Sequence, residues 1–327
     1  YNSDYYNVKQ YKTSNEVKWC PGCGDYVILS VIQKLFSELK INKSKTVFVS
    51  GIGCSSRFPY YMNTYGVHTI HGRAIPIATG IKLTNPELDV WVITGDGDCL
   101  SIGGNHLIHL LRRNLNINVI MFNNRIYGLT KGQYSPTSLK GKVTKSTPSG
   151  SIDNSLNVSS FILGNNSSFF ARTTDTNGNH MSSVLKEAYF HKGTSFVEIF
   201  QNCVVFNNKE FSIYKDKELY LENNKKLLFN NDKKGIILDH NSLELSIVEN
   251  NLENKEKILT HNQENLNLSS IYSNYEQNQN FPLFLGVFRR LLNKPTYEED
   301  LYKIKAKSSF NNLTIDQIIE GKETWSI

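Results

Sequence analysis

The segment DVWVITGDGDC (89–99) joins an apolar run directly to a polar turn that is rich in glycine and aspartate. The run DVWVIT (89–94) is short and contains β-branched residues, which predicts a strand buried on both faces. GDG (95–97) follows without a linker, so Asp96 is predicted at the carboxyl end of that strand. Parallel α/β sheets bind their ligands at this end. The segment therefore predicts both a fold class and the edge of the sheet where a site would lie.

Segments on both sides of this strand alternate between strand and helix patterns. Apolar runs predict further strands at 46–50, 117–122 and 194–200. Helical patterns lie between them: DYVILSVIQKLFSEL, with Asp25 as the expected N-cap, HGRAIPIATGIKL, NHLIHLLRRN and SSVLKEAYFHKG. Buried strands separated by helices predict an α/β fold with a parallel sheet in a three-layer domain.

After Phe206 the sequence is dominated by Asn, Lys and Glu, and its apolar patterning weakens. We expect the α/β domain to occupy residues 1–206 and an Asn/Lys-rich C-terminal extension to occupy 207–327. In that extension FPLFLGVFRRLL (281–292) is the one clearly apolar segment. We expect the extension to wrap the domain or a partner.

Composition favours a cytoplasmic enzyme over a membrane or nucleic-acid-binding protein. No apolar run reaches the roughly 18 residues of a membrane span, and no secretory leader is visible. Five cysteines, an odd number, favour a reducing compartment over a disulfide framework. The net charge of +6 comes without a basic stripe interleaved with aromatic residues, so we interpret it as a solvated surface and expect no nucleic-acid partner.

A second polar pair follows the next predicted strand. Asn123 and Asn124 come directly after 117–122, and Asn124 lies 28 residues beyond Asp96. Adjacent strand ends would present a carboxylate and an amide oxygen to one place, which suits Mg²⁺ holding a diphosphate. A P-loop sequence is absent, and GIGCSS (51–56) lacks the third glycine of the dinucleotide fingerprint.

The sequence WCPGCG (19–24) places Cys20 and Cys23 in a CxxC pair. That spacing alone suits structural zinc, a redox dithiol or a disulfide, and does not decide among them.

A series of motifs in order resembles the β subunit of the 2-oxoacid:ferredoxin oxidoreductases. GDG followed by NN resembles the thiamine-diphosphate motif, and the series comprises WCPGCG, GIGCSSR, HGRAIPIATGIKLTNPEL, GDGDCLSIGGNHLIHLLRRN and NNRIYGLTKGQYSPTS. The resemblance covers roughly residues 19–207, with a weaker match in GVFRR. It implies the thiamine-diphosphate-binding fold, in the form of its diphosphate-binding domain.

The resemblance also implies three cofactors. A [4Fe–4S] cluster would be held by Cys20, Cys23, Cys54 and Cys203, since thiolates suit iron. Mg²⁺ would be held by Asp96, Asn124 and the carbonyl of Ile126. Thiamine diphosphate would have its diphosphate lined by Gly97, Asp98, Gly128 and Leu129, and its thiazolium by Ile52, Gly53, Cys54 and Ser55. A Cys₄ zinc site remains an alternative, and Cys99 is expected to be a small buried core residue.

The implied catalytic and substrate residues each have an ordinary structural alternative. His71 and Arg73 lie where the family places its active site, but they could simply cap or pair within the fold. Arg57, together with Leu129, is expected at the substrate cavity, although an ordinary surface cation would look the same in the sequence. A guanidinium pairs well with a second carboxylate, so Arg57 favours 2-oxoglutarate over pyruvate. His106 and His109 are expected on a helix face.

The implied reaction is the coenzyme A-dependent oxidative decarboxylation of a 2-oxo acid to acyl-CoA and CO₂, with electrons passing through the cluster to ferredoxin. Related enzymes place a catalytic Glu on a separate pyrimidine-binding domain, so an α subunit is the expected partner in an αβ or α₂β₂ complex. The alternatives are a pyruvate-specific enzyme, a non-redox thiamine-dependent decarboxylase or synthase, and a non-catalytic electron-transfer or zinc-stabilised subunit.

Overall fold

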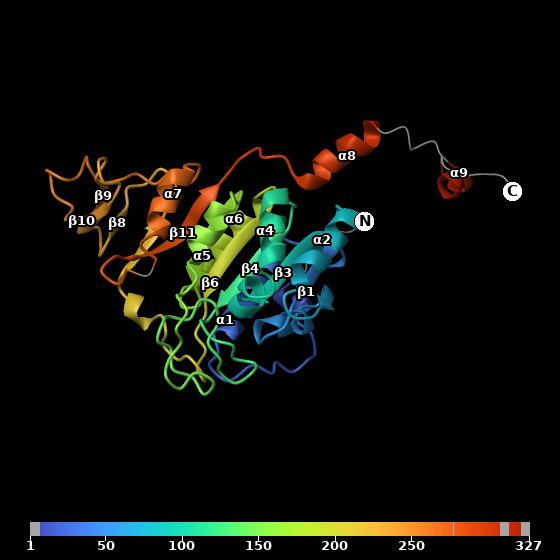
Figure 1. Cartoon of the computed structure of the whole chain (residues 1–327), viewed down its shortest axis with the longest axis horizontal. Coiled ribbons are helices and arrows are strands. Elements are labelled where there is room, and N and C mark those ends of the chain that lie inside the picture. The colour runs from blue at the N-terminus through green and yellow to red at the C-terminus, as the bar shows by residue number, and fades with distance from the viewer. Residues whose placement is uncertain (1–6, 277, 308–313, 322–327) are drawn as a thin grey trace.

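The computed structural model describes residues 7–276, 278–307 and 314–321. Its centre is an eight-stranded sheet with the order β2-β1-β3-β4-β6-β5-β11-β7, and helices cover both faces (Figure 1). The strands of this sheet are β1 (Thr46–Ser50), β2 (Tyr65–His68), β3 (Asp89–Gly95), β4 (Asn118–Asn123), β5 (Phe169–Thr174), β6 (Ser195–Phe200), β7 (Glu218–Leu221) and β11 (Leu283–Arg290). A smaller antiparallel sheet contains β8 (Leu228–Phe229), β9 (Lys234–Leu238) and β10 (Leu245–Glu249).

The α-helices lie in three groups. Two of them, α1 (Asp25–Glu38) and α6 (Gly178–Phe190), pack on each other and on one face of the large sheet. The opposite face is covered by α2 (Ala74–Thr84), α4 (Gly104–Arg113), α5 (Val158–Gly164) and α7 (Leu266–Ser273). The rest are α3 (Asp96–Leu100), α8 (Tyr297–Lys307) and α9 (Ile315–Glu320). None of the helices in the described ranges is long and apolar enough to cross a membrane.

Side-chain alternation along the strands builds the two cores between these three layers. On β3, Val90 and Val92 belong to the cluster under α2 and α4, whereas Trp91 and Ile93 belong to the cluster under α1 and α6. Alternate residues of a strand point to opposite faces, so a continuous apolar run fills both cores. This confirms the expected three-layer α/β architecture.

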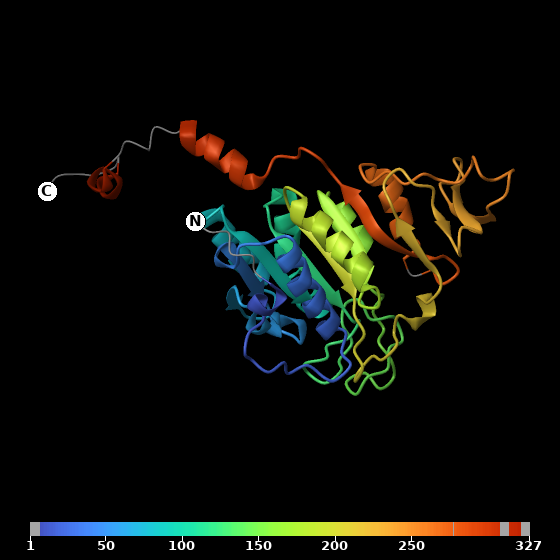
Figure 2. The ribbon, with the colours of Figure 1, turned by 180° about the vertical axis from the view of Figure 1, so that it is seen from behind.

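The large sheet is parallel from β2 through β5, and its last two strands come from the segment after Phe206. β11 pairs antiparallel with β5, and β7 pairs parallel with β11. The apolar segment 281–292 therefore supplies a sheet strand, β11, that adds to the same core. Figure 2 shows β11 beside the green and yellow centre of the sheet, with the small sheet beyond it.

A buried ion network ties this C-terminal segment to the sheet. Arg172 on β5 pairs with Glu198 on β6 at 2.7 Å and with Glu276 at 2.9 Å. All three side chains are buried. Removing one member of such a network would leave an uncompensated buried charge. The ion pair therefore fixes Glu276, which follows α7, against the sheet.

Candidate active site

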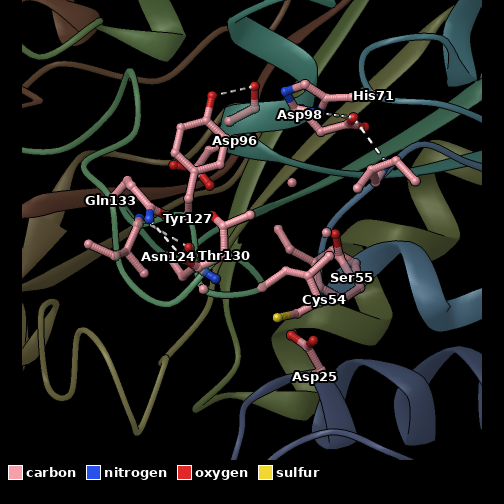
Figure 3. Close-up of a pocket in the computed structure, with 18 residues that line it drawn as sticks. Asp25, Cys54, Ser55, His71, Asp96, Asp98, Asn124, Tyr127, Thr130 and Gln133 are labelled. Carbon is pink, nitrogen blue, oxygen red and sulfur yellow. Dashed lines mark hydrogen bonds and ion pairs between the residues drawn. The ribbon is translucent and has the colours of Figure 1, made fainter. Parts of the chain in front are cut away.

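The carboxyl ends of the parallel strands enclose a cavity of about 440 Å³ (Figure 3). The loops after β1, β3 and β4 meet there because neighbouring parallel strands end at one edge of the sheet. The cavity is lined by Asp25, Ile52, Gly53, Cys54, Ser55, His71, Gly95, Asp96, Gly97, Asp98, Phe122, Asn124, Ile126, Tyr127, Gly128, Leu129, Thr130 and Gln133. The structure thus brings together the residues expected to bind Mg²⁺ and thiamine diphosphate.

Asp96, the first residue of α3, is a buried carboxylate without a positive partner. Its Oδ2 accepts hydrogen bonds from Ser135 at 2.5 Å and from Thr137 at 2.6 Å. Burial raises the pKa of Asp96, and these two hydroxyls lower it in part. Within the ranges that the structure describes, no lysine or arginine forms an ion pair with it. A buried carboxylate in this state suits a divalent cation.

The loop after β4 carries Asn124 and Ile126 on either side of a residue in the left-handed backbone region. That residue is Arg125, with φ of 56°, an unfavourable conformation for a side chain of this type. The Asn124 side chain accepts from the backbone N–H of Ile126 at 3.2 Å. The loop is therefore a tight turn that carries two of the three expected Mg²⁺ ligands.

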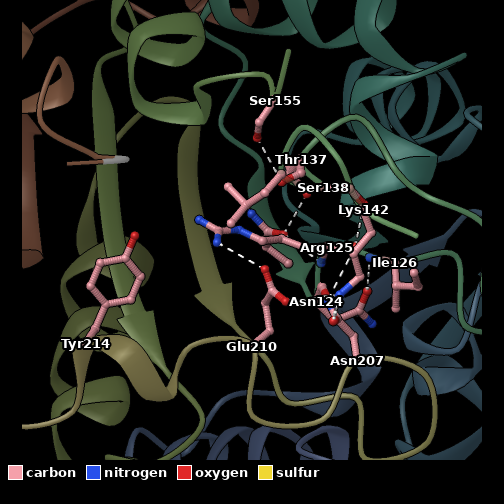
Figure 4. Close-up of polar contacts among 12 residues, drawn as sticks. Asn124, Arg125, Ile126, Thr137, Ser138, Lys142, Ser155, Asn207, Glu210 and Tyr214 are labelled. Atoms are coloured by element: carbon pink, nitrogen blue, oxygen red, sulfur yellow. Dashed lines mark hydrogen bonds and ion pairs between the residues drawn. The ribbon is translucent and has the colours of Figure 1, made fainter. Parts of the chain in front are cut away.

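Contacts from two other segments hold this turn in place (Figure 4). The Arg125 guanidinium is buried and pairs with Glu210 at 3.4 Å, and it lies 4.9 Å from the centre of the Phe211 ring. Ser138 donates to the Arg125 carbonyl at 2.6 Å, and Asn207 donates to the Asn124 carbonyl at 2.9 Å. These interactions offset the backbone strain at Arg125.

The carboxylate of Asp98 holds the other two loops of the cavity together. Its Oδ1 accepts from the backbone N–H of Gly72 at 2.7 Å and of Ile52 at 3.1 Å, and it contacts His71 Nδ1 at 2.8 Å. Thr94 donates to Oδ2 at 2.7 Å. Asp98 is therefore fully engaged through its side chain, and only its backbone is left for a ligand.

Of the remaining expected residues, His71 and Leu129 border this cavity, whereas Arg73 and Arg57 do not line it. Arg73 is the N-cap residue of α2. Arg57 is exposed and lines a second, neighbouring cavity of about 230 Å³. Leu129 borders both cavities.

All four expected cluster cysteines line that second cavity: Cys20, Cys23, Cys54 and Cys203. Cys54 also lines the larger cavity, so it lies on the wall between the two. A Cβ built on Gly128 would lie 3.5 Å from Cys54 Sγ and 3.7 Å from Cys203 Sγ, so both sulfurs lie close to Gly128. No three His, Cys, Asp or Glu side chains of the described residues converge to hold a single metal ion.

Hydrogen bonds fix the three cysteine-bearing segments to one another. Trp19 donates through Nε1 to the Cys54 carbonyl at 2.6 Å, and the N–H of Gly24 donates to the Asn202 carbonyl at 3.2 Å. Burial is the largest cause that raises the pKa of the Cys54 thiol, to about 12, and it also raises the pKa of Cys23. Thiolates at these positions therefore need a positively charged partner.

The other cysteine and the two helical histidines lie as expected. Cys99 is buried in the core under α2 and α4, and His106 and His109 are on α4. The expectation for Asp25 was wrong, because Gly24 is the N-cap of α1 and Asp25 is its first residue. Asp25 Oδ2 is buried without a hydrogen-bond partner, and burial raises the pKa of this carboxyl to about 7.

Two further residues of the site were not expected there from the sequence, although Tyr127 lies within the motif NNRIYGLTKGQYSPTS (123–138). Tyr127 donates through its hydroxyl to the Gly97 carbonyl at 3.1 Å, and a Cβ on Gly97 would lie 2.1 Å from the Tyr127 ring. This close approach requires glycine at position 97. Gln201 lines the smaller cavity and donates to Cys23 Sγ at 3.2 Å. The one sequence feature that could have indicated Gln201 as a site residue is its position directly after a buried strand.

Comparisons with known proteins agree with this geometry. Residues 51–199 match the family model of the thiamine pyrophosphate enzyme, C-terminal TPP binding domain. The chain is similar to the 2-oxoglutarate oxidoreductase subunit KorB of Mycobacterium tuberculosis, with 58% identity over 62% of this chain and 54% of that protein. It is 47% identical to 2-oxoacid:ferredoxin oxidoreductase 1, subunit beta, of Aeropyrum pernix over 64% of this chain and 66% of that protein.

Two further proteins are similar to this chain. The 2-oxoglutarate synthase subunit KorB of Methanocaldococcus jannaschii is 42% identical over 57% of this chain and 68% of that protein. A solved structure of 2-oxoglutarate:ferredoxin oxidoreductase from Magnetococcus marinus, with 2-oxoglutarate, coenzyme A and succinyl-CoA bound, has a TM-score of 0.79 at 29% identity. It matches 98% of this chain and 97% of that chain. The chain thus spans between about half and two thirds of the first two relatives, and nearly the whole of the solved chain.

Proposed function

The chain belongs to the family of 2-oxoacid:ferredoxin oxidoreductase β subunits, and we propose that it binds thiamine diphosphate, Mg²⁺ and a [4Fe–4S] cluster in such an enzyme. The observation that carries this proposal is the position of Cys54. It lies on the wall shared by the cavity that contains Asp96 and the cavity that all four cysteines line. A cofactor in the first cavity would therefore adjoin a cluster in the second.

The larger cavity fits thiamine diphosphate and its metal. Asp96, Asn124 and the carbonyl of Ile126 would hold Mg²⁺, and the unpaired buried carboxylate of Asp96 supports that role. Backbone N–H groups of Gly97, Asp98, Gly128 and Leu129 would donate to the diphosphate. Residues 52–55 would pass beside the thiazolium.

The smaller cavity fits a polynuclear cluster better than a single zinc ion. Zinc would require four sulfurs about 2.3 Å from one point, whereas here no three potential ligands among the described residues converge in that way. The four cysteines instead surround a space of about 230 Å³. Burial raises the pKa of the Cys23 and Cys54 thiols, so their thiolates need the positive charge of a bound metal.

When bound, thiamine diphosphate would supply the nucleophilic carbon and the electron sink for loss of CO₂ from a 2-oxo acid. His71 is held through Nδ1 by Asp98, which leaves Nε2 as the ring nitrogen that would hold or move a proton at the substrate. Arg73 lies two residues beyond His71 and would add positive charge beside the cavity without lining it. Cys54 would bind the cluster on the side that faces the cofactor.

A partner chain would complete the site. Thiamine catalysis needs a carboxylic acid against the aminopyrimidine ring, and the family resemblance assigns that role to a glutamate of a separate pyrimidine-binding domain. No glutamate is among the described residues that line the larger cavity. Ile52 and Leu129, which line it, are 37% and 46% exposed, and Ile70 and Ile102, which do not line it, are 70% and 50% exposed next to His71 and Gly72. Exposed apolar side chains gathered at a cavity are typical of an interface. We propose that an α subunit covers them in an αβ or α₂β₂ complex, and that ferredoxin accepts the electrons and coenzyme A the acyl group.

We favour 2-oxoglutarate as the substrate over pyruvate. Three of the similar proteins carry 2-oxoglutarate in their names. Arg57 is the proposed partner of the second carboxylate, although it lines the smaller cavity and not the larger one. A non-redox thiamine enzyme would leave the four clustered cysteines unexplained.

Steady-state kinetics of the complex with its α subunit, over a panel of 2-oxo acids, tests this substrate choice. Arg57→Ala should lower kcat/KM for 2-oxoglutarate far more than for pyruvate, because only 2-oxoglutarate has the second carboxylate. Lys131→Ala, which removes another exposed cation from the same cavity, is the control. Equal losses for the two substrates would remove Arg57 from this role.

A further inference from the structure

Gln201 lines the smaller cavity, and its side chain contacts Asn124, which lines both cavities. It directly follows β6, which is the sheet neighbour of β4, and its backbone N–H donates to the Asn123 carbonyl at 2.9 Å. The side chain is 1% exposed. Asn202 and Cys203 come next in the chain, so this side chain is placed between the Asn124 turn and the cysteines.

A chain of hydrogen bonds runs through its side-chain amide. Asn124 Nδ2 donates to Gln201 Oε1 at 2.9 Å. Gln201 Nε2 in turn donates to the Asn202 carbonyl at 2.6 Å and to Cys23 Sγ at 3.2 Å.

The direction of this chain is fixed at both ends. The backbone N–H of Ile126 can only donate, so the oxygen of Asn124 must face it. The carbonyl of Asn202 can only accept, so the nitrogen of Gln201 must face it. Both side-chain amides are therefore held in single orientations.

We propose that Gln201 is a positioning residue that joins the metal site to the cluster site, an inference that rests on the proposed function. Through Oε1 it would hold the Asn124 side chain in place for Mg²⁺. Through Nε2 it would donate to the cluster sulfur of Cys23. Partners of this kind orient metal ligands, and hydrogen bonds to cluster sulfurs help to set the reduction potential.

The two roles predict separable effects. A hydrogen bond to a cluster thiolate favours the reduced, more negative cluster, so its loss should shift the midpoint potential to a more negative value. Loss of the contact with Asn124 should raise the Mg²⁺ concentration needed for thiamine diphosphate binding by about tenfold or more, the usual effect of removing a partner of a metal ligand.

The test uses anaerobic complexes of the chain with its α subunit. The midpoint potential is followed by electron paramagnetic resonance, and thiamine diphosphate binding is measured by calorimetry over a range of Mg²⁺ concentrations. Gln201→Leu removes both contacts and should change both measurements. Gln201→Glu keeps an acceptor for Asn124 but loses the donor to Cys23, so it should shift the potential and leave the Mg²⁺ requirement near that of the wild type.

Gln33→Leu is the matched control. Gln33 is also a buried glutamine, 4% exposed, whose Nε2 donates to the Tyr61 carbonyl at 3.2 Å away from both cavities. It should change neither measurement. Unchanged values in Gln201→Leu, or effects equal to those of Gln33→Leu, would overturn the proposal while the proposed function stands. If Gln201→Leu does not assemble, a wild-type potential in Gln201→Glu would overturn it as well. A wild-type complex that binds neither iron nor thiamine diphosphate would instead contradict the proposed function.

Discussion

Thr137 donates a hydrogen bond to Asp96 at 2.6 Å, across 41 positions of the chain. Ser135 donates to the same carboxylate oxygen from the same loop. The orientation of Asp96 therefore depends on the loop after β4 as well as on the strand that precedes it. The proposed metal site therefore draws on the ends of β3 and β4 and on the loop after β4.

Removal of the Asp96 carboxylate should abolish thiamine diphosphate binding at physiological Mg²⁺. Asp96→Ala takes away the one charged ligand of the proposed set, whereas Asn124→Ala takes away a neutral oxygen and should weaken binding less. Calorimetric titration with Mg²⁺ present measures both. Normal binding by Asp96→Ala would show that the metal site is wrongly assigned.

The cysteine cavity should hold about four iron and four sulfide per chain after anaerobic purification, with a brown colour. Serine in place of Cys20, Cys23, Cys54 or Cys203 should impair the cluster, because each removes a thiolate ligand. Cys99→Ser is the control, since Cys99 lies in the core under α2 and α4. Stoichiometric zinc without sulfide in anaerobic protein would contradict the cluster assignment.

The Arg125–Glu210 pair should control how well the Asn124 turn binds metal. Glu210→Gln leaves the buried guanidinium with a neutral partner, so we expect a loss of about 1 to 3 kcal/mol in the free energy of unfolding. The Mg²⁺ requirement for thiamine diphosphate binding should rise several-fold, because the strained backbone at Arg125 is less well held.

Glu187→Gln is the matched control for that variant. Glu187 pairs with Arg290 at 3.3 Å, close to the 3.4 Å of the Arg125–Glu210 pair, but its side chain is 40% exposed and it is remote from the cavity. We expect less than about 1 kcal/mol of destabilisation and no change in the Mg²⁺ requirement. Equal Mg²⁺ requirements in the two variants would mean that the buried pair does not position the turn.

Acid should destabilise the chain through His191. Burial, with smaller effects of Arg290 and Lys294, lowers the pKa of this imidazole to about 4 from 6.5. Between these values the unfolded chain binds a proton that the folded chain does not, so stability is present above pH 6.5 and falls as the pH drops toward 4. His191→Gln, which keeps a polar group near Ser168, should flatten the pH dependence in denaturant titrations. An unchanged slope between pH 6.5 and 4 would contradict this.

The parallel part of the fold could be predicted because its strands are short apolar runs with clear ends. β1 lies at the expected residues 46–50, and the ends of β3, β4 and β6 lie within one residue of those expected. β5 was missed because FFARTT carries Arg172 in its middle, and the ion pairs with Glu198 and Glu276 make that arginine compatible with a core strand.

The candidate site likewise has residues that the sequence could predict and residues that it could not. Asp96, Asn124 and the cysteines follow strands or stand in short motifs, so their positions could be predicted and the structure brings them to two adjoining cavities. Their supports could not be predicted, because each contact joins distant parts of the chain. Glu210 reaches Arg125 across 85 positions, and Gln201 reaches Asn124 across 77. Such pairings depend on the folded sheet and leave no local pattern.

In the proposed enzyme, this chain supplies the cofactor and cluster half of an active site that a second subunit completes. The most direct test mixes the anaerobic, cluster-loaded chain with thiamine diphosphate, Mg²⁺, coenzyme A and 2-oxoglutarate, and follows cluster reduction by electron paramagnetic resonance. We predict an oxidised cluster in the chain alone and a reduced one after the α subunit is added. A reduced cluster in the homogeneous chain alone, or an oxidised one in the complete complex, would contradict this division of the site between two subunits.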